Sequence, residues 1–247
     1  MKGRLIILSG PSCVGKSPLD RALAKFYPEI KENLQPLVLY NDRQPRPGER
    51  DGIDYHFRSR EQIKSLKPES QFIILEVRGD LQALDLQELS SQLDSGHVFF
   101  EGNPFVGSML LSHQSLSHVK KMSMFMSPVS MEEIQFLQNA RTSMSLHELI
   151  TDIMRRKLLR RTRKQKSELS IKDLENIEKR AGSAYNELKM AHLFEFVLPN
   201  HDGEDSENWD SFFYPLGDAR KSLLAFVDLY NKRKSEYVEK WKEDLLK

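Results

Sequence analysis

The sequence has little cysteine, no excess of charge of either sign and no long hydrophobic run. Its one cysteine, Cys13, excludes an internal disulfide framework and a cysteine-rich zinc site. The 37 Lys and Arg residues nearly balance the 36 Asp and Glu residues, so the overall charge gives no argument for binding nucleic acid. No segment is apolar over the length that a bilayer requires. We therefore expect a cytoplasmic protein that binds neither membranes nor nucleic acid.

A glycine-bounded loop follows the first apolar run of the chain. The apolar run predicts a buried strand over residues 4–9, and a helical pattern covers residues 16–27. The loop between them reads Gly10-Pro11-Ser12-Cys13-Val14-Gly15-Lys16-Ser17, which matches G-x-x-x-x-G-K-S. In this motif the backbone N–H groups surround phosphates, the lysine reaches the β- and γ-phosphates, and the serine binds Mg²⁺. The motif predicts an ATP-binding site, and a glycine turn without a ligand is the alternative.

Strand and helix patterns alternate along the rest of the chain. We expect strands over residues 37–40, 55–57, 72–77, 97–102, 121–126 and 194–198. We expect helices over residues 59–66, 84–93, 171–192 and 223–246, one helix or a helix pair over the basic residues 145–166, and a further helix capped at Ser130. Residues 41–54 and the acidic residues 201–211 are predicted loops, the second of them exposed. The alternation predicts an α/β fold with a mostly parallel sheet and ligands at the carboxyl ends of its strands.

A second motif begins within the first of these loops, runs into the following predicted strand and suggests a family. It reads Arg43-Gln44-Pro45-Arg46-Pro47-Gly48-Glu49-Arg50-Asp51-Gly52-Ile53-Asp54-Tyr55-His56-Phe57. Together with the phosphate loop, it resembles the guanylate kinase family, whose acceptor loop reads R-x-P-R-x-G-E-x-D-G-x-D-Y-x-F. The resemblance is clear over residues 4–57, and it is fainter over residues 96–103, 125–134 and 177–202. The family transfers the γ-phosphoryl group of ATP to GMP and uses Mg²⁺.

The resemblance also implies how the chain is organised. It predicts a single domain over residues 1–247 with a P-loop NTPase three-layer core, a small acceptor-binding subdomain and a helical lid. The core would comprise residues 1–33, 96–137 and 177–215, and the acceptor-binding subdomain residues 34–95. A basic lid would cover residues 138–176, and a C-terminal helix residues 218–247.

Roles for individual residues follow from the resemblance. It implies that Arg43, Arg46 and Tyr55 bind the phosphate of the acceptor, which suits the planar donor fork of arginine. It implies that Glu101 lies near the Mg²⁺ bound by Ser17, and that Asn200 lies near the adenine. For the lid, Arg180 fits one catalytic arginine, and Arg160 or Arg161 fits the other. The alternative for each arginine is a solvated charge on a loop or helix.

The chain departs from the family where the family reads guanine. The three base-reading positions hold Leu39, Ile73 and Asn103, of which Asn103 keeps the ability to bind an acceptor. The second phosphate-binding Tyr of the family falls on Gln82. Because Leu39 and Ile73 cannot accept hydrogen bonds from guanine, a site lined by them should discriminate against this base. We expect a phosphate-bearing acceptor other than GMP, such as another nucleoside monophosphate or a ribosyl phosphate, or poor use of GMP.

The phosphate loop has two unusual residues. Cys13 stands where the family has glycine, and its thiol is either reactive, through a lowered pKa at the start of a helix, or inert. Pro18 has no N–H group to offer a phosphate, so we expect it to weaken nucleotide binding.

Two functional classes stay open at this point. The first is a kinase with a nucleotide donor and a small phosphorylated acceptor as partners, acting as a monomer or homodimer. The second is a catalytically weak module that binds nucleotides or protein partners. Lys16 and Ser17 are present in the phosphate loop, which favours the kinase.

Overall fold

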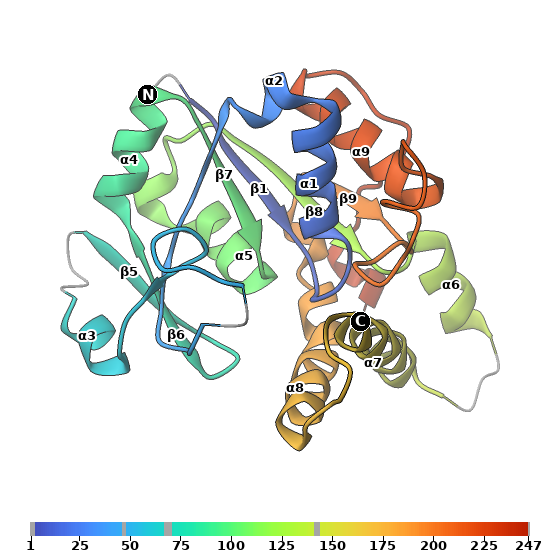
Figure 1. Cartoon of the computed structure of the whole chain (residues 1–247). Coiled ribbons are helices and arrows are strands. Elements are labelled where there is room, and N and C mark those ends of the chain that lie inside the picture. The colour runs from blue at the N-terminus through green and yellow to red at the C-terminus, as the bar shows by residue number, and fades with distance from the viewer. Residues whose placement is uncertain (1–2, 46–47, 67–70, 141–143, 247) are drawn as a thin grey trace.

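A five-stranded parallel sheet lies at the centre of the computed structural model, which describes residues 3–45, 48–66, 71–140 and 144–246 (Figure 1). Its strand order is β2-β7-β1-β8-β9, and every pairing is parallel. The strands are β1 (Leu5–Ser9), β2 (Leu34–Pro36), β7 (His97–Gly102), β8 (Lys121–Ser127) and β9 (Phe196–Pro199). The predicted α/β fold with a mostly parallel sheet is confirmed.

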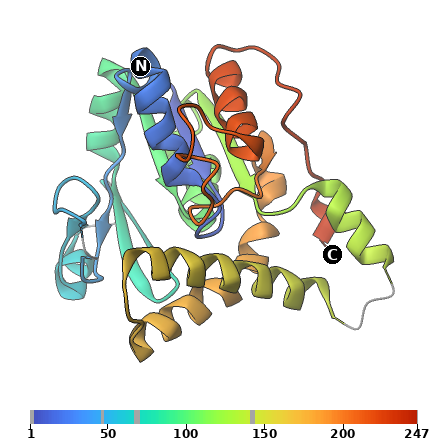
Figure 2. The same ribbon diagram turned by 45° about the vertical axis from the view of Figure 1, so that its right-hand side comes forward.

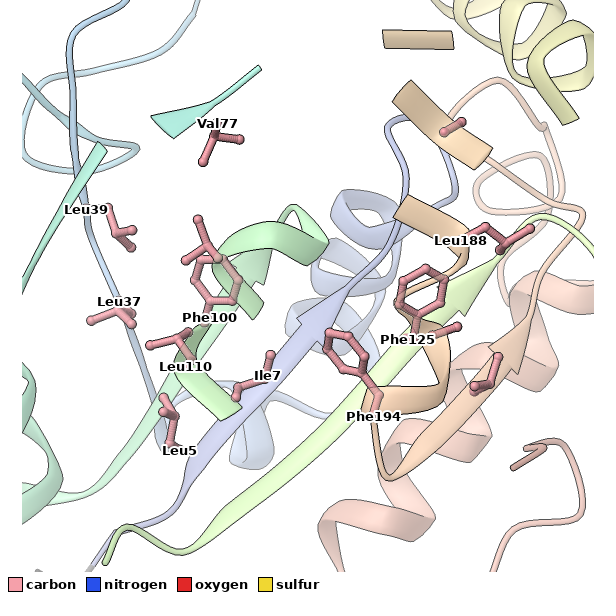
Figure 3. Close-up of a cluster of buried hydrophobic side chains, with 14 of the residues drawn as sticks. Leu5, Ile7, Leu37, Leu39, Val77, Phe100, Leu110, Phe125, Leu188 and Phe194 are labelled. Carbon is pink, nitrogen blue, oxygen red and sulfur yellow. The ribbon is translucent and has the colours of Figure 1, made fainter. Parts of the chain in front are cut away.

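Helices cover both faces of this sheet because side chains alternate along β1. Ile6 and Leu8 pack in the cluster that contains the apolar residues of the helices on one face, whereas Leu5 and Ile7 pack on the opposite face (Figure 3). The first face carries α1 (Lys16–Phe26), α2 (Pro28–Lys31) and α9 (Gly217–Tyr230). The second face carries α4 (Leu86–Ser95), α5 (Pro104–Ser112) and α6 (Met131–Asn139).

A second, four-stranded sheet stands beside the core with the order β4-β3-β6-β5 (Figure 1). Its strands are β3 (Tyr40–Asn41), β4 (His56–Phe57), β5 (Phe72–Val77) and β6 (Asp80–Asp85). The helix α3 (Arg60–Ser65) begins with the expected capping box, in which Ser59 and Gln62 each bond the other's backbone N–H group. The sheet falls within residues 34–95, although the division into subdomains itself stays a prediction.

Two helices, α7 (Leu146–Gln165) and α8 (Ile171–Leu188), pack against each other as a hairpin (Figure 2). Capping boxes fix their starts, with Ser145 bonded to Glu148 and Ser170 bonded to Asp173. The hairpin lies below the end of β1 at which the phosphate loop begins, so its basic residues can approach that loop (Figures 1 and 2).

The structure differs from the sequence predictions in several elements. The predicted strand over 37–40 is wrong, since β2 ends at Pro36 and β3 begins at Tyr40. The strand β6 and the helix α5 were not predicted. The terminal helix over 218–247 is also wrong: α9 ends at Tyr230, and a later segment pairs Glu239 with Val197 of β9. Extended pairing of Glu239 and burial of Trp241, which is 3% exposed, override the helical pattern there.

The acidic segment 201–211 is irregular, as predicted, but it is not an exposed loop. Trp209 is only 8% exposed, and its indole Nε1 donates to Asp202 O at 2.7 Å. The segment therefore packs onto the core beside the phosphate loop. Within the described part of the chain, no helix combines the length and the apolar character needed to cross a membrane.

Candidate active site

The phosphate loop, the second sheet and the helical hairpin enclose a cavity of about 410 Å³. Residues from all three parts line it, so the two motifs found in the sequence meet in one place. The charged lining residues are Lys16, Asp20, Lys31, Arg43, Glu49, Asp54, Arg78, Asp80, Glu101, Arg161, Arg180 and Glu204. Both cations and anions line the wall, a combination that is compatible with phosphates bound together with a metal ion.

The shape of the loop requires glycine at the two glycine positions of the motif. Gly10 has φ 151° and Gly15 has φ 105°, and both values lie in the region that favours glycine. A Cβ atom on Gly10 would lie 2.4 Å from Met126 O, and one on Gly15 would lie 2.4 Å from Asn200 Nδ2. Ser12, Cys13, Lys16 and Ser17 of this loop line the cavity, together with Gly10.

Lys16 lies within the phosphate loop at the start of α1. Its Nζ donates to Gly10 O at 2.9 Å and to Pro11 O at 2.8 Å. Burial lowers the pKa of Lys16, and the carboxylates of Glu204 and Glu101 oppose that shift. A buried ammonium group held next to the loop amides is placed to neutralise phosphate charge in a site of low dielectric.

Ser17 and Glu101 offer oxygen ligands on the wall of the cavity. The Ser17 hydroxyl donates to Glu101 Oε1 at 2.7 Å, and Glu101 stands on β7 next to the phosphate loop. Burial raises the pKa of Glu101, while Lys16 and the Ser17 hydroxyl lower it. Mg²⁺ prefers few protein oxygens together with water and substrate phosphates, so this pair fits Mg²⁺. The described residues contain no group of three or more His, Cys, Asp or Glu side chains that could hold a metal ion.

The acceptor motif brings Arg43 and Tyr55 to the same cavity. Arg43 pairs with Glu49 through both terminal nitrogens, at 2.6 Å and 2.7 Å, and its guanidinium carbon lies 5.0 Å from the centre of the Tyr55 ring. This pairing holds the donor fork of Arg43 in a fixed orientation. Arg46 lies outside the described residues.

Apolar side chains form one side of the cavity beside the second sheet. Leu37, Leu39, Val77 and Phe100 line it and belong to one buried cluster (Figure 3). Ile73 belongs to the same cluster but does not line the cavity. The guanine-reading positions therefore contribute packing here, as the sequence indicates for Leu39.

Three amide side chains lie near these apolar residues, in addition to the charged residues named above. Asn103 lines the cavity while its Oδ1 accepts from Val106 N at 3.0 Å, which caps α5. Asn41 and Gln82 face each other across β3 and β6 and are 1% and 4% exposed. The Nδ2 atom of Asn41 is buried and has no hydrogen-bond partner in the described part of the chain. An acceptor that supplies an oxygen there would satisfy it.

The lid arginines separate into two environments. Arg161 and Arg180 line the cavity: Arg161 Nη1 donates to Glu204 at 2.9 Å, and Arg180 Nε donates to Ser12 Oγ at 3.0 Å. The side chain of Arg160 is 63% exposed and pairs with Asp205 at 3.0 Å outside the cavity. The structure thus brings two of the three predicted arginines to the site and leaves Arg160 on the surface.

Asn200 contacts the backbone of the phosphate loop. It is fully buried, and its Nδ2 donates to Val14 O at 2.7 Å and to Asp202 O at 2.8 Å. Both amide hydrogens are used inside the protein, and the residue does not line the cavity. Asn200 thus joins the phosphate loop to the segment that contains Asp202, and its place near the adenine stays a prediction.

The sequence interpretation missed Arg78, which lines the cavity, and the partner acids Glu187 and Glu204. Arg78 lies in the turn between β5 and β6, and recognition of β6 would have placed it at the tip of a hairpin. The two acids lie far along the chain in a helix and an irregular segment. No local pattern signals that they meet the arginines, because these pairings form only in the folded chain.

Cys13 is predicted to be unreactive toward alkylating agents in the native protein. Its backbone is left-handed, with φ 68°, and the side chain is 1% exposed. Burial raises the pKa of the thiol to about 12, which favours the inert one of the two alternatives. At a pH of about 8 the thiolate fraction should be about 10⁻⁴. Iodoacetamide labelling followed by intact-mass measurement checks this, with urea-unfolded protein as the positive control. Labelling of native protein at the unfolded rate would contradict it.

Comparisons with known proteins agree with the geometry. A family model described as guanylate kinase matches residues 2–89. A guanylate kinase of Pseudomonas fluorescens is 28% identical over 250 aligned positions, which cover 99% of this chain and 97% of that protein. One of Chlorobaculum tepidum is 34% identical over 149 positions, covering 60% of this chain and 73% of that protein. The crystal structure of guanylate kinase from Anaplasma phagocytophilum has the same fold, with a TM-score of 0.51 and 18% identity, covering 95% of this chain and 88% of that one.

Proposed function

Because the chain belongs to the guanylate kinase family of nucleoside monophosphate kinases, we propose that it transfers the γ-phosphoryl group of ATP to the phosphate of a small acceptor. One observation supports this above the others: Lys16 of the phosphate loop and Arg43 of the acceptor motif line a single cavity. A donor and an acceptor bound by these two groups would face each other. Phosphoryl transfer needs mainly such alignment and charge neutralisation.

The proposed roles follow the geometry. The loop amides and Lys16 bind the phosphates of ATP, and Ser17 with Glu101 holds Mg²⁺, which would neutralise charge on the donor. Arg43 and Tyr55 bind the phosphate of the acceptor, with Arg46 as a further candidate. Arg161 and Arg180 stabilise the negative charge on the phosphoryl group during its transfer.

For the acceptor, GMP is the substrate named for the family, but the wall of this cavity favours a base that needs few hydrogen bonds at Leu39 and Val77. We propose that GMP is used poorly and that another nucleoside monophosphate or a ribosyl phosphate is the better acceptor. A base edge left unpaired against hydrocarbon loses free energy of binding, which supports this choice.

The test is a panel of acceptors with ATP and Mg²⁺, in which ADP formation is measured. The panel contains GMP, AMP, CMP, UMP, dTMP and ribose 5-phosphate. Acceptor-dependent ADP formation that stops on chelation of Mg²⁺ is the expected result. Its absence with every acceptor would overturn the kinase and leave a nucleotide-binding module. If GMP were turned over far better than all other acceptors, the kinase would stand and the proposal on the acceptor would fail.

A further inference from the structure

Arg78 occupies an unusual backbone position at the edge of the cavity. Val77 of β5 pairs with Asp80 of β6, so Arg78 and Gly79 form the turn of this hairpin. Their φ values are 54° and 88°. Turns with two positive φ values favour Asn and Gly, because a larger side chain is strained there. An arginine at this place is more strained than an asparagine would be. Such strain is found mainly where a side chain has a functional role.

The guanidinium of Arg78 is anchored on one side. Its Nε donates to Glu187 Oε1 at 2.8 Å, and its Nη2 donates to the same oxygen. Glu187 is fully buried on α8, and the Ser183 hydroxyl also donates to it at 2.6 Å. Nη1 is the remaining nitrogen of the fork, and it points to the phosphate loop, where it donates to Ser12 Oγ at 3.2 Å.

A second guanidinium meets the same oxygen. Arg180 Nε donates to Ser12 Oγ at 3.0 Å, so two cations from different parts of the chain converge on one neutral hydroxyl. Both arginines line the cavity, as does Lys16. A phosphoryl oxygen carries charge and is a stronger acceptor for guanidinium groups than a hydroxyl. Their convergence at the phosphate loop therefore marks an anion position.

We propose that Arg78 is a catalytic residue that contacts the phosphoryl group being transferred. Nη1 exchanges Ser12 for an oxygen of that group, while Nε and Nη2 stay on Glu187. An acceptor phosphate oxygen forms a bond to the γ-phosphorus as the bond to the bridging oxygen of ATP breaks, and ADP leaves with that electron pair. Arg78 neutralises charge on the equatorial oxygens. The proposal rests on the proposed kinase function.

Arg78 also links the two halves of the reaction in space. Its hairpin belongs to the sheet that contains Asn41 and Gln82 of the cavity wall, whereas its guanidinium contacts the phosphate loop. Placement of the acceptor-side sheet thus sets the position of a group on the donor side.

The variant Arg78→Asn removes the guanidinium and places a favoured residue in the turn. The double variant Arg78→Asn with Glu187→Gln also avoids leaving a buried carboxylate without its partner. The matched control is Arg60→Asn. Arg60 Nη1 donates to Gly79 O at 3.2 Å and to Asp42 at 2.7 Å, so it fastens the same hairpin, but it does not line the cavity.

Two measurements test the proposal. The first is the affinity for inorganic tripolyphosphate by calorimetry, which needs no turnover. We expect both Arg78 variants to bind about tenfold to 100-fold more weakly, and Arg60→Asn to bind as the native chain does. The second is turnover with the best acceptor, where we expect a fall of about 100-fold or more at saturation. Added guanidinium ion should restore part of the turnover of Arg78→Asn. It should leave the turnover of Arg60→Asn unchanged.

Unchanged tripolyphosphate affinity in both Arg78 variants would overturn the proposal. An equal loss in Arg60→Asn would also overturn it, since fastening of the hairpin would then explain the effect. If the native chain turns over no acceptor, the kinase function fails, and the calorimetry alone decides whether Arg78 contacts phosphate.

Discussion

Replacing Lys16 by Met should lower turnover by about 100- to 1,000-fold while changing the melting temperature little. In the native chain, Lys16 Nζ is bonded to Gly10 O and Pro11 O, beside the loop amides that are proposed to bind phosphate. Met keeps most of the side-chain volume but cannot neutralise the charge that develops on the phosphoryl group. The loss should therefore appear at saturating substrate concentrations.

Stability should respond weakly, because two effects of removing the Lys16 cation oppose each other. Burial lowers the pKa of Lys16, so the charged group is costly to keep, while the Glu204 and Glu101 carboxylates stabilise it. Steady-state kinetics of Lys16→Met measure the turnover, and differential scanning fluorimetry measures the melting temperature.

The matched control is Lys25→Met on the same helix. Lys25 Nζ donates to Phe213 O at 3.3 Å and lies outside the cavity, so turnover should match that of the native chain. Turnover of Lys16→Met within tenfold of the native value would contradict the proposed role. An equal fall in both variants would point to α1 itself rather than to the ammonium group.

Local sequence patterns were sufficient where the local environment decides the structure. The phosphate loop with its flanking strand and helix could be predicted because its motif is contiguous in the chain and places glycines at the two positions of positive φ, Gly10 and Gly15. The capping boxes at Ser59 and Ser130 were likewise predictable, because each one closes within a single helical turn. In both cases the residues that determine the structure are neighbours in the chain.

The predictions failed where distant residues decide. The last helix was extended too far because the pairing of Glu239 with Val197 and the burial of Trp241 cannot be read from a charged, helix-like pattern. The choice between Arg160 and Arg161 depended on which one faces the cavity, and adjacent residues on a helix point about 100° apart. Only the packing of α7 decides that Arg161 faces inward.

The strand β6 shows a third kind of failure. Leu81, Gln82, Ala83 and Leu84 are all buried. The sequence therefore lacks the alternation of apolar and polar residues that is expected of a strand with one solvent-exposed face. Missing β6 also meant missing the hairpin turn that carries Arg78. A single misassigned strand thus removed a cavity residue from the predicted site.

Replacing Arg43 by Met should raise the KM for the acceptor by about tenfold to 100-fold, with little effect on the KM for ATP. Arg43 reaches the cavity with both terminal nitrogens directed to Glu49, an arrangement that suits a planar anion with two oxygens. Phosphate can take the place of a carboxylate on such a fork. The effect should be confined to the acceptor, because the proposed donor site is formed by the loop amides and Lys16 rather than by the acceptor motif.

Arg43→Lys keeps the positive charge but loses the planar donor fork. Its KM for the acceptor should therefore lie between the values for the native chain and for Arg43→Met. The control is Arg58→Met, because Arg58 follows β4, pairs with Asp51 of the acceptor motif at 3.0 Å and does not line the cavity. Initial rates measured with each substrate varied in turn distinguish the two KM values. If Arg43→Met raised the KM for ATP as much as that for the acceptor, the arginine would act on the whole cavity, and its assignment to the acceptor phosphate would fail.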